Sequence, residues 1–404
     1  MLPAGRRIFL AYLVYFGALG AAYPYLPVFY RDIGLTFAEI GLLTAIQAAI
    51  QLALGPVWGG LMDRFPRVGL TLPLAAAVAS AGGFLLFLAS DFASSLAGSM
   101  LLFAGLAGIG PTLDARTLET LGPRARHLYG QVRAFGSLAF VIVALLVGLL
   151  LEARGSRALF WVYLPCLVGT ILVTATIRRR GTTRSVSLLR GAGQVLGAPG
   201  ILPFLAGFTI VWTSLTAVNA FYSIQVVALG GTTGLVGITW AFGAIIEVPL
   251  MYAFPRLGAR FGTERLMVFG ALAFVLRNVL ASVATDPVAL VLIAPLEGLG
   301  FACAFVGGVT VLAARLPASL GGTAQGLFSA STGLATILGS ALGGTIAGAV
   351  GIHAMFAASG AIGLVGVIVL GYAVIGPRAG IGPARSQAEL APTASMVTGR
   401  DNVS

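Results

Sequence analysis

Twelve long apolar runs, separated by short polar or charged segments, constrain the fold of this sequence more than any other feature. Each run reaches about 20 residues, the length at which a helix spans the hydrocarbon core of a bilayer. Hydrophobic residues make up 58% of the chain and charged residues only 9%, whereas a soluble domain carries roughly a quarter charged residues. The chain is therefore predicted to be an all-α membrane protein with twelve transmembrane helices. The predicted spans are residues 7–29, 38–61, 68–90, 94–118, 128–151, 158–177, 201–229, 235–254, 265–284, 287–314, 324–349 and 353–375.

The arginines fall mainly on one side of these spans. That side is predicted to be cytoplasmic, because cytoplasmic loops of membrane proteins carry an excess of basic residues. The opposite side receives only Arg31, Arg154 and Arg157. We therefore expect a multi-pass protein of the plasma (inner) membrane with both termini cytoplasmic. The side predicted to be cytoplasmic receives Arg6, Arg7, Arg64, Arg67, Arg124, Arg126, Arg178, Arg179, Arg180, Arg184, Arg190, Arg256, Arg260, Arg265, Arg315, Arg378, Arg385 and Arg400.

The longest polar interruption divides the chain into two sets of six spans. The predicted units are a first six-helix bundle at residues 1–177, a cytoplasmic central loop at 178–200, a second bundle at 201–375 and a disordered tail at 376–404. Segment 59–67 follows the second span, and the weakly similar segment 255–262 follows the eighth span. This echo predicts two pseudo-symmetric bundles, an arrangement in which a solute site lies between the repeats near the bilayer midplane.

A short motif follows the second predicted span. Gly59, Asp63, Arg64 and Arg67 match the pattern Gly-x-x-x-Asp-Arg-x-Gly-Arg, with Pro66 where glycine is usual. With twelve spans, this motif resembles the signature of the major facilitator superfamily and implies the major facilitator fold. The resemblance implies a gating role for the acid and the arginines, which would hold the cytoplasmic helix ends together in one state. The alternative is a basic cytoplasmic loop that contains one acid.

Three longer segments resemble one branch of that superfamily, the lactose permease and phenylpropionate permease-like proton symporters. These segments are 22–33, 112–115 followed by 129–137, and the region of the eighth to tenth spans. The resemblance implies that Asp114 and Arg133 pair and engage the solute, and that Arg277 contributes to the same site. A gate near the cytoplasmic helix ends, formed with Arg116 and Glu119, is the alternative for this group.

The resemblance also has gaps. Glu297 stands where lactose permease has a histidine, and Gly300 stands where that family carries its proton on a glutamate. Ala244 occupies the position of the glutamate that binds the sugar. A lactose-like substrate is therefore not expected.

Three charged residues are predicted at similar depths on consecutive spans. Glu247, Arg277 and Glu297 lie on the eighth, ninth and tenth spans, where an unpaired charge costs roughly 2.5–3.5 kcal/mol on insertion scales. One cation between two acids leaves an excess negative charge, so one acid should bind a proton. We expect Glu297 to carry the proton with help from Glu247. A structural ion pair that never titrates is the alternative.

Polar residues recur on single faces of two further spans. Asn219, Tyr222 and Gln225 are spaced i, i+3, i+6 on the seventh span, and Gln47 and Gln51 are spaced i, i+4 on the second. Such a face can hydrogen-bond a solute, so Asn219 and Tyr222 are candidate substrate-binding residues. Hydrogen bonds between helices are the alternative.

The predicted function is proton-coupled symport of a small polar or anionic organic solute by alternating access. Proton-coupled export of drugs or metabolites is one alternative, and a non-transporting receptor or sensor is another. The expected partners are the solute, protons and the bilayer, with no nucleic acid, and the chain is expected to act as a monomer. Neither an enzyme, a cofactor nor a metal is expected, because the sequence shows no catalytic constellation and no metal-binding framework. Cys166 and Cys303 lie in apolar runs, and His353 is expected to be a solvated helix cap.

Overall fold

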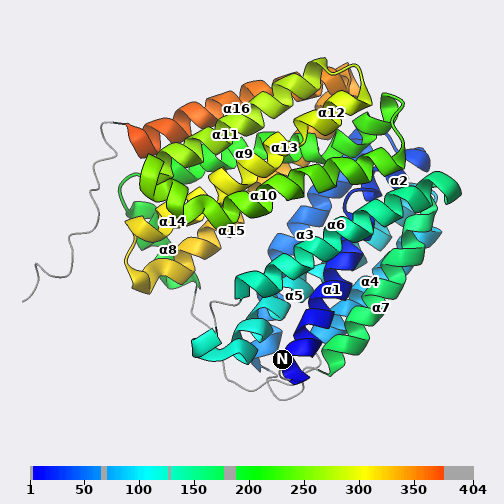
Figure 1. Ribbon diagram of the computed structural model, residues 1–404, viewed down its shortest axis with the longest axis horizontal. Helices are drawn as coiled ribbons and strands as arrows, with labels where there is room; N and C mark the ends of the chain where they lie inside the picture. The colour runs from blue at the N-terminus through cyan, green and yellow to red at the C-terminus, as the bar shows by residue number, and fades with distance from the viewer. Residues whose placement is uncertain (1–2, 65–70, 126–128, 177–187, 377–404) are drawn as a thin grey trace, which may run out of the picture.

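The computed structural model describes residues 3–64, 71–125, 129–176 and 188–376. All regular secondary structure within these residues is helical, which confirms the predicted all-α class. Twelve helices or helix runs in the described residues are long and apolar enough to cross a membrane. Their bounds differ from the predicted ones mostly at the ends, because side-chain polarity alone does not mark where a helix leaves the bilayer. Figure 1 shows these helices gathered into two bundles.

The first bundle contains the first six spans. Its helices are α1 (Pro3–Ala22), α2 (Leu26–Asp32), α3 (Phe37–Arg64), α4 (Thr71–Leu88), α5 (Phe92–Ala125), α6 (Tyr129–Arg154), the short η2 (Ser156–Ala158) and α7 (Leu159–Ala175). The helices α1 and α2 together form one span, as do η2 and α7. Buried aromatic and small residues such as Tyr12, Phe29 and Ala79 form the core of this bundle.

The second bundle contains the last six spans. Its helices are α9 (Ile201–Ala228), α10 (Thr233–Phe261), α11 (Thr263–Val283), α12 (Pro287–Ile293), α13 (Pro295–Gly300), η3 (Phe301–Phe305), α14 (Val306–Arg315), the short η4 (Ala318–Leu320), α15 (Gly321–Val350) and α16 (Ile352–Ile375). The pieces from α12 to α14 together form one span. A cluster of buried side chains that includes Phe208, Phe274 and Phe328 fills the core of this bundle.

The tenth span is broken into four pieces. Pro295 begins α13, and proline has no backbone N–H to continue the ladder of a preceding helix. A five-residue π-helix, Phe301–Phe305, then separates α13 from α14, and π-helical turns within α-helices occur frequently at functional sites. Glu297 therefore lies on a short helix with an irregular segment on either side.

A helix that was not predicted lies within the central segment. The sequence predicts only a polar loop at 178–200, whereas residues Leu188–Gly197 form α8. This helix packs against α15 and α9, and Val195 on it is fully buried. The apolar run in this segment is too short to predict a helix from the sequence. Burial of its apolar side chains against the second bundle stabilises the helix. Residues 178–187, and the tail from residue 377, lie outside the described parts of the chain.

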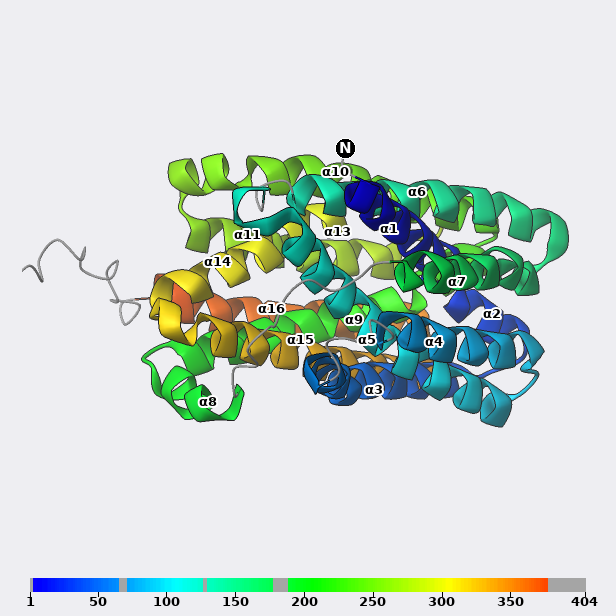
Figure 2. The same cartoon turned by 90° about the horizontal axis from the view of Figure 1, so that it is seen from below.

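The two bundles meet mainly at one end of the molecule. Figure 1 shows them converging at the end that carries α2 and α12 and diverging toward the end where the chain begins. We call the first of these the closed end and the second the open end. The contacts across the seam are made chiefly by α3 with α15 and by α6 with α10. Figure 2 shows these two helix pairs on opposite edges of the seam.

Glycines allow the backbones of the two bundles to touch at the closed end. A Cβ atom added to Gly41 of α3 would lie only 2.6 Å from the Cα atom of Gly344 in α15. On the other edge, the Thr233 hydroxyl donates to the Gly148 carbonyl at 2.8 Å. The Gly234 N–H donates to Oε1 of Glu152 at 2.9 Å. The Glu152 carboxylate thus caps the first turn of α10 from the other bundle.

Replacing Glu152 with alanine is expected to loosen the closed end. The variant removes a charge-assisted hydrogen bond between bundles, and we expect a shift of about 1 kcal/mol toward separated ends because the carboxylate is exposed. Spin labels at Ser90 and Thr285, in a background without the native cysteines, would report the distance between the closed ends of the two bundles. The matched control is Glu39→Ala, because the Glu39 carboxylate bonds only Thr36 of its own bundle. An equal change in both variants would contradict the interpretation.

Candidate functional site

The charged residues of the second bundle are joined through an asparagine. Arg277 of α11 is buried, with 1% of its side chain exposed. Its Nη1 atom donates to Oδ1 of Asn219 on α9 at 2.8 Å. The Nδ2 atom of Asn219 donates to Oε1 of Glu297 on α13 at 2.9 Å. Asn219 therefore stands between the base and the acid, where the sequence predicts a direct approach of the two charges.

An aromatic ring completes the surroundings of the arginine. The Arg277 guanidinium carbon lies 4.1 Å from the centre of the Tyr222 ring, close enough for a cation–π interaction. The Tyr222 hydroxyl donates to the Leu290 carbonyl at 2.8 Å, which places the end of the tyrosine against α12. The Nε atom of Arg277 has no hydrogen-bond partner among the described residues. The guanidinium is thus held by one amide and one ring.

Glu247, the second acid of the second bundle, lies one helical turn after Gly243, the residue of α10 that faces the Glu297 carboxylate. A Cβ atom added to Gly243 of α10 would lie 3.4 Å from Oε2 of Glu297, and Glu247 follows Gly243 at i+4. A Cβ on Gly298 would lie 3.1 Å from the Glu247 backbone nitrogen, so α10 and α13 are in close contact there. The charge of Glu247 interacts with Glu297 and also with Arg133 of the first bundle.

Asp114 and Arg133 contact different side chains of α1. The Tyr12 hydroxyl of α1 donates to Oδ1 of Asp114 at 2.5 Å, whereas the Arg133 guanidinium lies 4.3 Å from the centre of the Phe16 ring. The predicted ion pair between Asp114 and Arg133 is not formed in the described structure. Tyr12 and Phe16, spaced i, i+4 on α1, each contact one of the two charges instead.

The structure describes only part of the predicted gate. Arg116 is buried within α5, and Arg64 is exposed at the end of α3. The side chains of Asp63 and Glu119, and all of Arg67, lie outside the described parts of the chain. A gating role for these five residues stays a prediction.

A cavity of about 160 Å³ lies at the seam between the bundles. Asn219 lines it, which connects the cavity to the Arg277–Asn219–Glu297 network. Amide, hydroxyl and aromatic groups dominate the wall, and none of the described residues that line the cavity is charged. The lining residues are Tyr23, Leu26, Pro27, Tyr30, Thr44, Gln47, Ala48, Gln51, Phe103, Thr216, Asn219, Ala220, Thr336 and Ser340.

A larger, more apolar cavity of about 620 Å³ adjoins the first one toward the open end. Ala48, Gln51 and Thr336 line both cavities, so the two spaces share part of their walls along α3 and α15. Leu52 and Trp212 supply apolar surface in the larger one. Polar side chains therefore make up a larger share of the wall in the inner part of the seam than in the outer part. No group of three or more His, Cys, Asp or Glu side chains in the described residues is arranged to hold a metal ion.

Two polar contacts were missed from the sequence. His353 is not a simple solvated cap, because its Nε2 atom lies 2.9 Å from Nε2 of Gln225 and its Nδ1 atom 2.9 Å from the Ser282 carbonyl oxygen. In the first bundle, the Gln47 amide donates to the Tyr30 hydroxyl at 3.0 Å. Gln225 and Gln47 could have indicated these contacts, since each is a polar residue in an apolar span. Their partners could not be predicted, because they lie on other helices.

Twelve spans in two bundles, with polar and charged side chains buried along the seam, define a membrane transporter of the major facilitator type. A model of the MFS_1 like family matches residues 6–358, and the chain belongs to that family. The relatives found in sequence comparison include both permeases and drug efflux pumps.

Two relatives and one solved structure give the extent of the similarity. The maltose permease of Geobacillus stearothermophilus is 30% identical over 274 residues, covering 67% of this chain and 69% of that protein. The probable 3-phenylpropionic acid transporter of Escherichia coli is 26% identical over 293 residues, covering 69% and 74%. The crystal structure of the nucleoside transporter NupG superposes with a TM-score of 0.82 at 15% identity, covering 92% and 99%. These matches confirm the resemblance to the superfamily and, for NupG, the fold alone.

The bridging position of Asn219 predicts an energetic coupling with Glu297. Asn219→Leu removes hydrogen bonds to two charged groups, each worth about 1.5–3 kcal/mol. In a double-mutant cycle with Glu297→Ala, which removes the acceptor, the two changes should be non-additive by about 1 kcal/mol or more, because the residues share one contact. The measurement is the free energy of unfolding of the purified protein in detergent. Thr310→Val, a change at an exposed residue outside the network, should be additive with Glu297→Ala. Strict additivity of the Asn219 and Glu297 changes would show that the hydrogen bond contributes nothing.

Proposed function

We propose that this protein is a proton-coupled symporter of the plasma (inner) membrane that carries a small polar organic solute by alternating access between its two bundles. Asn219 supports this proposal most directly, since one side chain both lines the central cavity and joins Glu297 to Arg277. A solute that binds at Asn219 would compete for the hydrogen bonds that hold the acid. Solute binding and the protonation of Glu297 would then influence each other.

The cavity wall favours a neutral solute over an anionic one. Amide and hydroxyl groups both donate and accept hydrogen bonds, and they surround the cavity without a charged side chain among the described lining residues. Aromatic rings of Tyr23, Tyr30 and Phe103 offer flat apolar faces beside them. A small molecule with several hydroxyl or amide groups on a compact frame matches this wall. In this proposal Arg277 serves the acid network, and the solute meets Asn219.

Export is a second candidate function, supported by the larger cavity. Its volume of about 620 Å³ and its apolar lining at Leu52 and Trp212 suit an amphipathic molecule, and drug efflux pumps are among the relatives. The direction of proton-driven transport separates the two candidates. A symporter accumulates its solute on the side toward which protons flow, whereas an antiporter depletes its solute from that side.

The asymmetry of the arginines supports the proposed orientation, in which the open end lies in the cytoplasm. With the open end in the cytoplasm, Ser156 of η2 would face the outside and Gln194 of α8 would face the inside. Cysteine variants at these two positions, in a background without native cysteines, should differ in reactivity toward a membrane-impermeant maleimide added to intact cells. Ser156→Cys should be labelled and Gln194→Cys should be labelled only after the cells are opened. The reverse pattern would invert the proposed topology.

Glu297→Gln is expected to separate accumulation from exchange. The amide keeps an oxygen that can accept from Asn219 but cannot release a proton, so the variant mimics the protonated acid. In proteoliposomes, a pH gradient should no longer drive accumulation of the solute, whereas exchange at equal pH should continue. The solute is first found by a thermal-shift screen, since a ligand that binds the folded state stabilises it.

Glu39→Gln is the matched control for this experiment, because Glu39 caps its own helix at the closed end. This control should keep both activities. Glu247→Gln should behave like Glu297→Gln if the two acids share the proton. Accumulation against a gradient by Glu297→Gln would exclude Glu297 as the obligatory carrier, and Asp114 would then be the next candidate.

A further inference from the structure

A third pocket lies away from the seam, at the open end of the second bundle. It has a volume of about 370 Å³ and forms where the end of α10 turns into α11, beside the last turn of α16. All three of these helices are membrane spans, and Phe261, Thr263 and Ile375 are their terminal residues. The pocket therefore lies where the spans end, at the boundary between hydrocarbon and water. The lining residues are Arg260, Phe261, Gly262, Glu264, Arg265, Val374 and Ile375.

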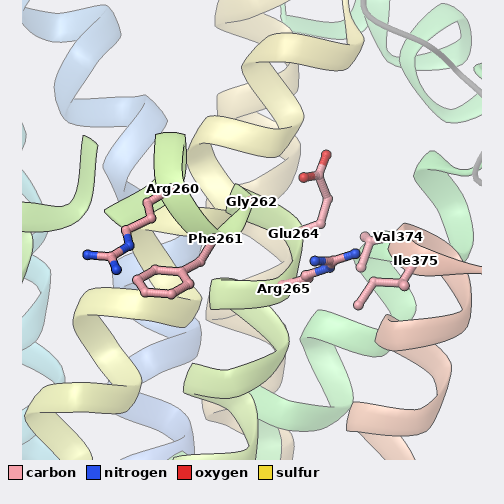
Figure 3. A pocket seen from close by; sticks show the side chains of 7 residues that line it. All are labelled: Arg260, Phe261, Gly262, Glu264, Arg265, Val374 and Ile375. Atoms are coloured by element: carbon pink, nitrogen blue, oxygen red, sulfur yellow. The ribbon is translucent and has the colours of Figure 1, made fainter. Parts of the chain in front are cut away.

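The pocket carries positive charge that the described structure leaves unpaired. Arg265 makes no ion pair or hydrogen bond with the described residues, and the guanidinium carbon of Arg260 lies 5.2 Å from the centre of the Phe261 ring. Figure 3 shows the Arg265 side chain extending toward Val374 and Ile375, whereas Arg260 extends to the other side of the Gly262 turn. Arg265 thus faces the end of α16, and Arg260 adds to the positive potential from the opposite flank.

The backbone adds to the attraction for an anion. Gly262 precedes α11 with a φ of 88°, and no side chain caps the first turn of this 21-residue helix. The first N–H groups of a helix carry partial positive charge. Glu264 opposes this attraction because it also lines the pocket. Two arginines and one acid leave the pocket with a net positive charge.

An apolar surface runs from the pocket along the two helices that border it. α11 and α16 pack against each other, and both expose large apolar side chains at helical spacing. On α11 these are Phe269, Leu272 and Leu276, and on α16 they are Leu364, Ile368 and Tyr372. A ligand with a charged head in the pocket would lay apolar chains along this surface.

We propose that this pocket binds the headgroup of an anionic phospholipid, with the phosphate at Arg265 and the acyl chains along α11 and α16. The site combines positive charge at the membrane boundary with an apolar path into the bilayer, and both are needed to distinguish a lipid from a free anion. Basic pockets between membrane helices bind anionic headgroups for this reason. A zwitterionic lipid carries its own ammonium group and gains less from the two arginines.

Native mass spectrometry of the purified full-length protein tests the proposal. The protein in detergent is mixed with equal amounts of phosphatidylglycerol and phosphatidylethanolamine that carry the same acyl chains, and the first bound lipid is identified. Arg265→Gln should lower the ratio of phosphatidylglycerol to phosphatidylethanolamine by about fivefold, as expected for one basic residue near a headgroup. Arg260→Gln together with Arg265→Gln should lower this ratio further.

Arg154→Gln is the matched control. Arg154 is also an exposed arginine beside an aromatic ring, with its guanidinium 6.0 Å from the Trp161 ring, but it lies at the closed end. This variant should leave the ratio nearly unchanged. Glu264→Gln should raise the ratio, because it removes the acid from the pocket, and a gain of binding cannot result from misfolding.

Three outcomes would overturn the proposal. If Arg265→Gln leaves the ratio of phosphatidylglycerol to phosphatidylethanolamine unchanged, Arg265 does not bind the headgroup. An equal loss in Arg154→Gln would mean that any surface arginine attracts the lipid. Displacement of phosphatidylglycerol by inorganic phosphate alone would identify a site for free anions, without a contribution from the acyl chains.

Discussion

The cost of an unsatisfied charge or polar group in hydrocarbon constrains where the candidate site residues of this protein lie. Such a group must meet a partner inside a bundle or reach the seam, since lipid offers none. Arg277 is 1% exposed, and an amide and an aromatic ring hold it there. Glu297 meets the same amide from a broken helix. The position of Asn219 therefore fixes two charges at once.

Glycines allow helix backbones to come into direct contact both at the seam and within the second bundle. Gly41 meets Gly344 through backbone atoms, and Gly298 brings α13 against Gly243 of α10. The first contact joins the two bundles, whereas the second lies within one bundle. Apolar packing also joins the bundles at the closed end, where the rings of Phe37 and Phe221 lie 6.1 Å apart and one buried cluster draws residues from both bundles. Separation of this end therefore exposes apolar surface as well as breaking hydrogen bonds such as that of Glu152.

The sequence predicts the spans well because hydropathy is a local property. It predicts the contacts of side chains less well, since these depend on how each helix is rotated about its axis. Asn219 was placed on a polar face correctly, but its position between Arg277 and Glu297 depends on three helices. Asp114 and Arg133 do not pair in the described structure, where Asp114 accepts a hydrogen bond from Tyr12 and Arg133 lies over the Phe16 ring. No local pattern in the sequence records that arrangement.

The charges divide into a set within one bundle and a set that crosses the seam. Arg277, Asn219 and Glu297 all belong to the second bundle, so a rigid rotation of one bundle against the other leaves their hydrogen bonds intact. Glu247 interacts with Arg133 across the seam as well as with Glu297. Movement of α6 relative to α10 changes the first interaction and spares the second. In the proposed cycle, the electrostatic surroundings of Glu247 therefore change when the bundles move. Glu297 is instead coupled to solute binding through its hydrogen bond with Asn219.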